Sequence, residues 1–161
     1  YKYYNIKMKK KISTLLLLLI LSSCGYEAKY SSKNIKNYNF SINKINFIGD
    51  RVLNIRIKGI LNSYTQSVSE KNFILEISSE SEKVTTAKDS AGDPTNFQNV
   101  IRVRVSVFIN TELEENFLIS ENFSYKNNSD KLELESYERE IKNNLAELAS
   151  EKIINRLSSI Q

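Results

Sequence analysis

The 161-residue chain has no histidine, no tryptophan, a single cysteine and a single methionine. Without histidine, the chain alone cannot form a Ser-His-Asp or Cys-His nucleophile system, or a zinc site that uses histidine. The glutamates at positions 133, 135, 138 and 140 would spread over more than one face of a helix, as solvated charges do. We therefore expect a protein that is not an enzyme and that holds no metal ion or cofactor.

Positive charge is concentrated near the N-terminus. Residues 1–23 hold five of the 23 Lys and Arg residues and no acid, so the remainder carries 18 basic and 19 acidic groups. Domains that bind nucleic acid usually carry a clear excess of basic residues. The remainder of this chain has no such excess, and we expect no binding to nucleic acid.

Residues 8–23 have the organisation of a bacterial signal peptide. Met8 is followed by three lysines and then by the mainly apolar residues 12–21. This run is about half of the ~20 apolar residues that a permanent membrane-spanning helix needs, so the pattern favours an export signal. Residues 1–7 precede a plausible start at Met8, and we interpret them as an upstream extension.

The export segment ends in Leu21-Ser22-Ser23-Cys24-Gly25, which resembles a bacterial lipobox. We expect Cys24 to be lipidated and to become the first residue of the mature protein. The alternatives are an ordinary signal peptide with a free cysteine, or a short uncleaved anchor. A lone thiol would be unusual in an oxidising compartment, whereas a covalent lipid accounts for it. Gly25 resembles the sorting signal for the outer membrane, where the lipid would anchor the protein.

The mature chain is expected to hold a tether and one domain. Residues 24–37 begin with the lipidated cysteine and continue as a polar, aperiodic segment, which is typical of a tether. Residues 38–161 are long enough for one hydrophobic core but not comfortably for two. We expect them to form a single periplasmic α+β domain.

Alternation of apolar and polar residues predicts four strands in this domain. They cover residues 38–48, 72–79, 96–110 and 116–125. The first strand changes phase near Asn43-Lys44, as a β-bulge would produce. The second continues, or forms a hairpin, through residues 83–88, and residues 89–94 are rich in turn-forming types. In the third strand, Arg102 and Arg104 face away from the alternating valines.

Helical spacing predicts two amphipathic helices. The first covers residues 51–64 with Asp50 as its N-cap, and Gly59 within it indicates either close packing or an early end. The second covers residues 131–158 and begins at Asp130.

The second helix has further expected features. Glu133 is placed to complete a capping box with Asp130. Glu135–Arg139 and Glu138–Lys142 are spaced as i,i+4 ion pairs. An apolar stripe is formed by Tyr137, Ile141, Leu145, Leu148, Ala149, Ile153 and Leu157.

The element order is β-α-β-β-β-α. When strands that follow one another in sequence also pair, both helices can cover one face of the sheet. The predicted fold is therefore a two-layer α+β domain, in which two helices pack on one face of a mixed sheet of about four strands.

Taken together, the chain resembles the LptE family of lipoproteins, which take part in lipopolysaccharide assembly at the outer membrane. The residues that carry the resemblance are Cys24-Gly25-Tyr26, Asp50-Arg51, Ile60-Leu61, the strand pair around residues 102–125, Ser136-Tyr137-Glu138-Arg139-Glu140, Leu148-Ala149 and Arg156-Leu157. None of these is a catalytic motif.

The resemblance implies a non-enzymatic partner that plugs the LptD outer-membrane β-barrel, assists its folding and binds lipopolysaccharide. On this hypothesis Arg102 and Arg104, and also Lys83 and Lys88, are candidates for contact with lipid A phosphates, because cations bind phosphate. The alternative is that these residues form a solvated strand face and hairpin tip.

A second function fits the same features. An auxiliary lipoprotein of an ABC-type lipid transport system would share the export signal, the tether and a small α+β domain. The proteins that co-purify with the chain would distinguish the two hypotheses.

Overall fold

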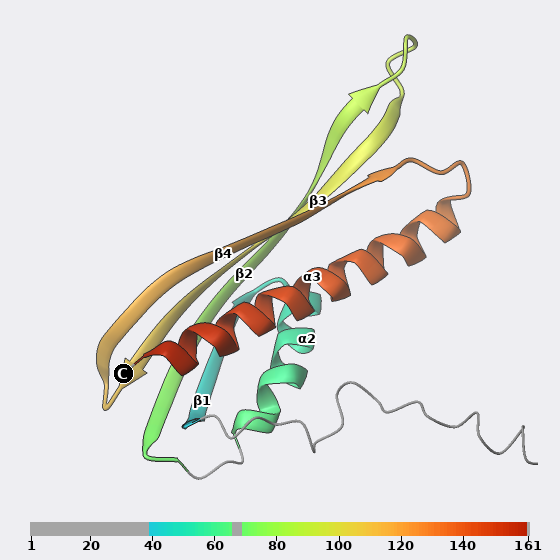
Figure 1. The fold of residues 1–161 in the computed structure, drawn as a ribbon. Helices are drawn as coiled ribbons and strands as arrows, with labels where there is room; N and C mark the ends of the chain where they lie inside the picture. Colours follow the sequence, from blue (N-terminus) through green and yellow to red (C-terminus); the bar gives the residue numbers. More distant parts are fainter. Residues whose placement is uncertain (1–38, 66–68, 161) are drawn as a thin grey trace, which may run out of the picture. The chain divides into compact units, whose positions relative to one another are not determined.

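The computed structural model describes residues 39–65 and 69–160, which belong to one compact unit, Tyr38–Gln161 (Figure 1). The predictions made for residues 1–7, 8–23 and 24–37, including lipidation of Cys24, lie outside the described residues.

The described part of the unit contains a four-stranded sheet in the order β1-β2-β3-β4. The strands are β1 (Phe40–Gly49), β2 (Lys71–Lys88), β3 (Pro94–Ile109) and β4 (Glu112–Lys126). β1 and β2 are parallel, and the other two pairs are antiparallel. The mixed sheet predicted from the sequence is confirmed.

Two details of the strands follow from the sequence pattern. The register between β1 and β2 shifts between Ile42 and Lys44, where the change of phase predicted a bulge. β2 runs without interruption to Lys88, so the second strand continues and forms its hairpin only at residues 89–93. The resulting β2–β3 ribbon extends beyond the end of β4 (Figure 1).

Both helices lie on the same face of the sheet, as predicted (Figure 1). Helix α2 (Arg51–Leu61) connects the parallel strands β1 and β2 and ends in the 3-10 turn η2 (Asn62–Tyr64). Helix α3 (Lys131–Ser159) follows β4 and packs against α2, β3 and β4. The predicted helix 51–64 is therefore α-helical only as far as Leu61.

The core lies between the helices and the sheet. Every second side chain along the central parts of β2 and β3 points into it, because side chains alternate across a strand. The fully buried large residues are Phe40, Ile42, Leu53, Ile57, Leu61, Phe73, Leu75, Ile77, Ile101, Val103, Ile153 and Leu157. Burial of a side chain of this size contributes about 1.5–3 kcal/mol, so this layer holds the elements together.

A close backbone contact fixes the junction between β1 and α2. Gly49 has φ +98°, and a Cβ there would lie 1.9 Å from the carbonyl oxygen of Ser79. The next residue, Asp50, donates its backbone N–H to the same oxygen at 2.9 Å. Only glycine fits this approach at this backbone conformation.

Asp50 joins three elements at this point. Its Oδ1 accepts the backbone N–H groups of Val52 and Leu53, as expected of an N-cap. Its Oδ2 accepts the Ser81 hydroxyl from β2 at 2.6 Å and the Lys142 ammonium from α3 at 2.9 Å. The cap was predicted from the sequence, but these two tertiary contacts were not.

The contacts at the start of α3 differ from the sequence prediction. Asp130 caps the helix by accepting the N–H groups of Leu132 and Glu133. The predicted capping box is not formed, because Asp130 donates its own N–H to Asn128 and Glu133 accepts the Asn128 amide. A residue preceding the cap therefore takes the place expected of Glu133.

The predicted ion pair Glu138–Lys142 was wrong. Glu138 pairs with Lys83 of β2, and Lys142 pairs with Asp50, because the sheet and the start of α2 offer partners of opposite charge. The structure also gives no ion pair between Glu135 and Arg139 within residues 39–65 and 69–160.

The predicted apolar stripe of α3 is correct in five of its seven members. Ile141, Leu145, Ala149, Ile153 and Leu157 are buried. Tyr137 and Leu148 are about half exposed, and Ala146, Ser150 and Ile154 are buried in addition. The buried side of α3 includes these three residues because the helix also packs against α2.

Candidate functional site: the open face of the sheet

The open face is the side of the sheet opposite the two helices. Arg102 and Arg104 point to this face from the centre of β3, as their alternation with buried valines predicted. Arg102 is paired in register with Glu80 of β2, and Arg104 with Leu118 of β4. The two arginines therefore lie near the middle of the face.

Arg102 is engaged by carboxylates of the neighbouring strand. Its Nη1 lies 3.4 Å from Glu82 and 3.7 Å from Glu80. Arg104 has no such partner in the part of the chain that the structure describes, and it is exposed. Of the two, Arg104 is the more available to an external anion.

The remainder of the open face is covered by amides, hydroxyls and some apolar side chains. The Gln98 amide donates to Asn122 at 3.0 Å, and the Asn116 amide donates to Ser106 at 3.3 Å. Leu118, which is 55 % exposed, is an apolar side chain on the same face. Non-obligate protein interfaces are about as apolar as the rest of a protein surface, so this mixed composition does not by itself mark an interface.

Lys83 lies on the other side of the sheet. Its Nζ is 2.5 Å from Glu138 of α3 and 4.0 Å from the centre of the Phe97 ring. Glu138 also accepts the Tyr125 hydroxyl at 2.8 Å. Burial, together with the hydrogen bond and charge of Glu138, raises the pKa of Tyr125 above its ordinary value. Lys83 thus connects the sheet to α3.

The four basic candidates consequently do not form one cluster. Arg102 and Arg104 share the open face, Lys83 is on the helix side, and Lys88 is at the far end of the β2–β3 ribbon. Glu80 and Glu82 were not predicted from the sequence as neighbours of Arg102. Their alternation along β2 was visible in the sequence, but their position beside Arg102 depends on the strand register.

The described residues contain no group of three or more His, Cys, Asp or Glu side chains arranged to hold a metal ion. Within the same residues, no helix is long and apolar enough to cross a membrane. What the open face offers is a broad surface with both charges.

This fold is shared with several solved bacterial lipoproteins. No protein-family model and no curated protein sequence matches the chain. The rare lipoprotein B of Shewanella oneidensis is 14% identical with a TM-score of 0.56, and the match covers 73% of this chain and 95% of that one.

Two further solved structures of bacterial lipoproteins have a similar fold. A minor lipoprotein of Acinetobacter baumannii is 12% identical with a TM-score of 0.58, covering 76% of this chain and 92% of that chain. An uncharacterised lipoprotein B of Nitrosomonas europaea is 11% identical with a TM-score of 0.52, covering 84% and 91% respectively. At these identities the similarity shows that the fold is the same.

Proposed function

We propose that the chain is an outer-membrane lipoprotein, anchored through Cys24, that plugs a lipopolysaccharide-translocating β-barrel of the LptD type and assists its assembly. On this proposal it also binds lipopolysaccharide during insertion into the outer leaflet. The observation that carries the proposal is a lipobox-like sequence at residues 21–25, followed by a domain with the fold of the lipoprotein B structures.

The open face supports a partner of this kind. In the described residues neither helix covers this face, and it carries glutamates, arginines, amides and the exposed Leu118. The lumen of a large barrel is polar, so a plug needs hydrogen-bonding groups on its surface. A wide face of mixed character meets that need better than a deep pocket would.

The arginine pair supports contact with lipopolysaccharide. Arg104 is exposed and free of an ion-pair partner in residues 39–65 and 69–160. A guanidinium group can make two parallel charge-assisted hydrogen bonds to a phosphate. Arg102 could join it only by exchanging its contacts with Glu80 and Glu82, so we assign the larger role to Arg104.

The partner is tested by purifying the lipidated protein from a detergent-solubilised envelope. We expect one large outer-membrane barrel at near-equal stoichiometry, with lipopolysaccharide bound to the complex. A Cys24→Ser variant is the matched control for the anchor. Recovery of ABC-transport components would support the auxiliary lipoprotein instead, and recovery of the protein alone would contradict both proposals.

The arginine assignment is tested separately. The double variant Arg102→Gln/Arg104→Gln should bind lipopolysaccharide about tenfold more weakly, since hydrogen bonds to charged groups contribute about 1.5–3 kcal/mol before solvent exposure reduces them. Arg51→Gln/Arg139→Gln, which removes two charges elsewhere, should bind as the wild type does. Equal binding by both double variants would remove the arginines from the proposal.

A further inference from the structure

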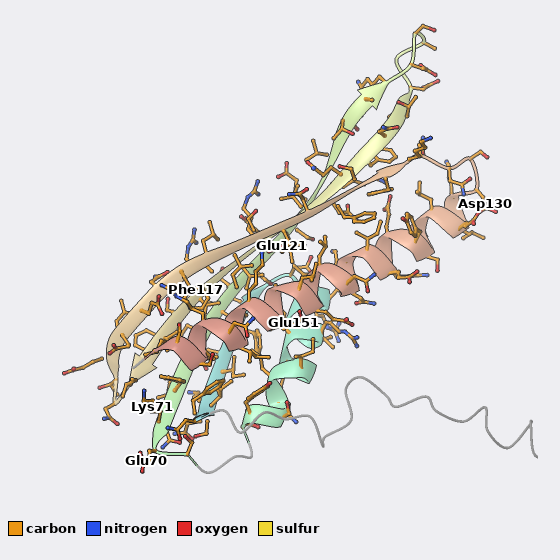
Figure 2. All side chains as sticks on the ribbon, viewed as in Figure 1. Glu70, Lys71, Phe117, Glu121, Asp130 and Glu151 are labelled. Carbon is orange, nitrogen blue, oxygen red and sulfur yellow. The ribbon has the colours of Figure 1, made fainter. Side chains whose placement is uncertain are left out.

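A hollow of about 600 Å³ lies where β4 passes into α3. It is lined by the end of β4, by the connecting residues and by the first turns of α3, near Asp130 in Figure 2. Neither Arg102 nor Arg104 lines it. The hollow is thus separate from the residues on which the proposed function rests.

One wall of the hollow is aromatic. The rings of Tyr125 and Tyr137 meet edge to face, with centroids 6.0 Å apart and planes at 84°. Tyr125 is held in place by Phe97, whose ring centroid is 5.8 Å away, and by the hydrogen bond to Glu138. Tyr137 is 43 % exposed, so part of its ring is open to a ligand.

The rest of the lining is mainly polar. The Asn128 amide donates to Glu133 Oε2 at 2.8 Å, which orients that carboxylate. Ser136, Glu140 and Lys126 also line the hollow, and the described part of the chain provides no hydrogen-bond or ion-pair partner for their side chains. The hollow therefore presents both donors and acceptors to a ligand.

These groups select a class of ligand. Two carboxylates against one ammonium disfavour an anion, since like charges repel. A purely apolar ligand would leave the polar groups without partners, which is unfavourable. A sugar ring has an apolar face for an aromatic side chain, and its hydroxyls both donate and accept hydrogen bonds.

We propose that this hollow binds a pyranose sugar without anionic groups. The sugar ring lies against Tyr137, and its hydroxyls bond to Ser136, Glu140 and the oriented Glu133 carboxylate. The site goes beyond the proposed function, because it requires neither the barrel nor the arginines of the open face.

The test uses the full lipidated chain in a detergent that has no sugar group. In saturation-transfer NMR with methyl β-glucopyranoside and methyl β-glucosaminide as probes, saturation should pass from the protein to the ring protons of the sugar. Tyr137→Ala should weaken the affinity about fivefold, as expected for loss of an aromatic contact. Tyr137→Phe, which keeps the ring, should bind nearly as well as the wild type.

Leu148→Ala is the matched control, because Leu148 is on the same helix and is 46 % exposed. It should leave sugar binding unchanged. Absence of transfer to both probes would overturn the proposal, and so would a Tyr137→Ala variant that binds as the wild type does. Thermal unfolding of each variant would show that the fold is retained.

The source of the sugar is tested by competition. An oligosaccharide cleaved from lipopolysaccharide and freed of phosphate is compared with chitobiose as a free glycan. If either oligosaccharide displaces the probe, the result supports the site and identifies the source. If neither displaces the probe, the result contradicts the site. If the probes bind but no barrel co-purifies, the proposed function fails and this site stands.

Discussion

Two residues at the junction of β1 and α2 fix the start of α2 against β2 and α3. Gly49 allows the backbone to approach Ser79, and Asp50 joins the start of α2 to β2 and α3. Gly59, within α2, is in a different position, because a Cβ added there would meet no neighbouring atom within 4 Å. Position 49 therefore requires glycine, whereas position 59 has room for a side chain.

Alanine substitution should therefore change the free energy of unfolding in opposite directions at the two positions. Gly49→Ala places a side chain in the Ser79 carbonyl at a positive φ, and should lower the free energy of unfolding by more than about 2 kcal/mol. Gly59→Ala meets no neighbour and should raise it by about 0.5–1 kcal/mol, because alanine favours the helix. Urea denaturation measures both, and a stable Gly49→Ala variant would contradict the close approach.

The ionisation of Asp50 should make the free energy of unfolding depend on pH in the acidic range. Burial alone would raise its pKa, but hydrogen bonds from Ser81 and the Leu53 backbone, with the hydrogen bond and charge of Lys142, outweigh burial and lower the pKa to about 2. The ordinary value is 3.8, so the folded state favours the ionised form. This stabilisation is present above about pH 4 and is lost as the pH falls from about 4 to about 2.

Asp50→Asn keeps a capping side chain but removes the charge. It should be less stable than the wild type at pH 7 by about 1 kcal/mol, a value reduced for solvent screening of the partly exposed pair. The difference should shrink as the pH falls from about 4 to about 2. Chemical denaturation at a series of pH values tests this, and a difference that does not change with pH would exclude the carboxylate as its cause.

At the scale of elements, α3 is held by packing beneath it and by ion pairs along its sides. Glu147 pairs with Arg56 of α2, and Lys152 pairs with Glu121 of β4, which is labelled in Figure 2. Partly exposed pairs of this kind contribute about 0–1 kcal/mol each, so the buried stripe supplies most of the stability.

Two leucines of α3 differ sharply in burial. Leu145 is 3 % exposed and Leu148 is 46 % exposed, although the sequence placed both on the apolar stripe. Leu145→Ala should cost about 2–5 kcal/mol, and Leu148→Ala less than about 1 kcal/mol. Equal losses in thermal or urea unfolding would show that Leu148 is buried as the periodicity predicted.

Periodicity predicted the elements of this domain better than their contacts. It located the strands and helices of the described residues, because alternation and helical spacing record which face is buried. Periodicity could not show that Leu148 is exposed, because helical spacing alone does not say where α3 loses contact with its neighbours. It also missed the partners of Glu138 and Lys142, which come from β2 and the start of α2.

For the whole molecule, the order of elements predicted the two-layer fold, because parallel β1 and β2 need a crossover and hairpins connect the rest. The candidate site was less accessible to prediction. Alternation placed Arg102 and Arg104 on one face, but the register that sets Glu80 beside Arg102 depends on strand pairing. The hollow beside Tyr137 depends on how α3 returns over the sheet, which no local pattern records.

We expect this domain to be held at a membrane through lipid on Cys24. Intact-mass and N-terminal peptide analysis of the protein from native envelopes tests it most directly. The expected result is a mature chain that begins at Cys24 and carries the mass of covalently attached acyl groups. A mature chain that begins elsewhere, or one that has an unmodified Cys24 thiol, would contradict it.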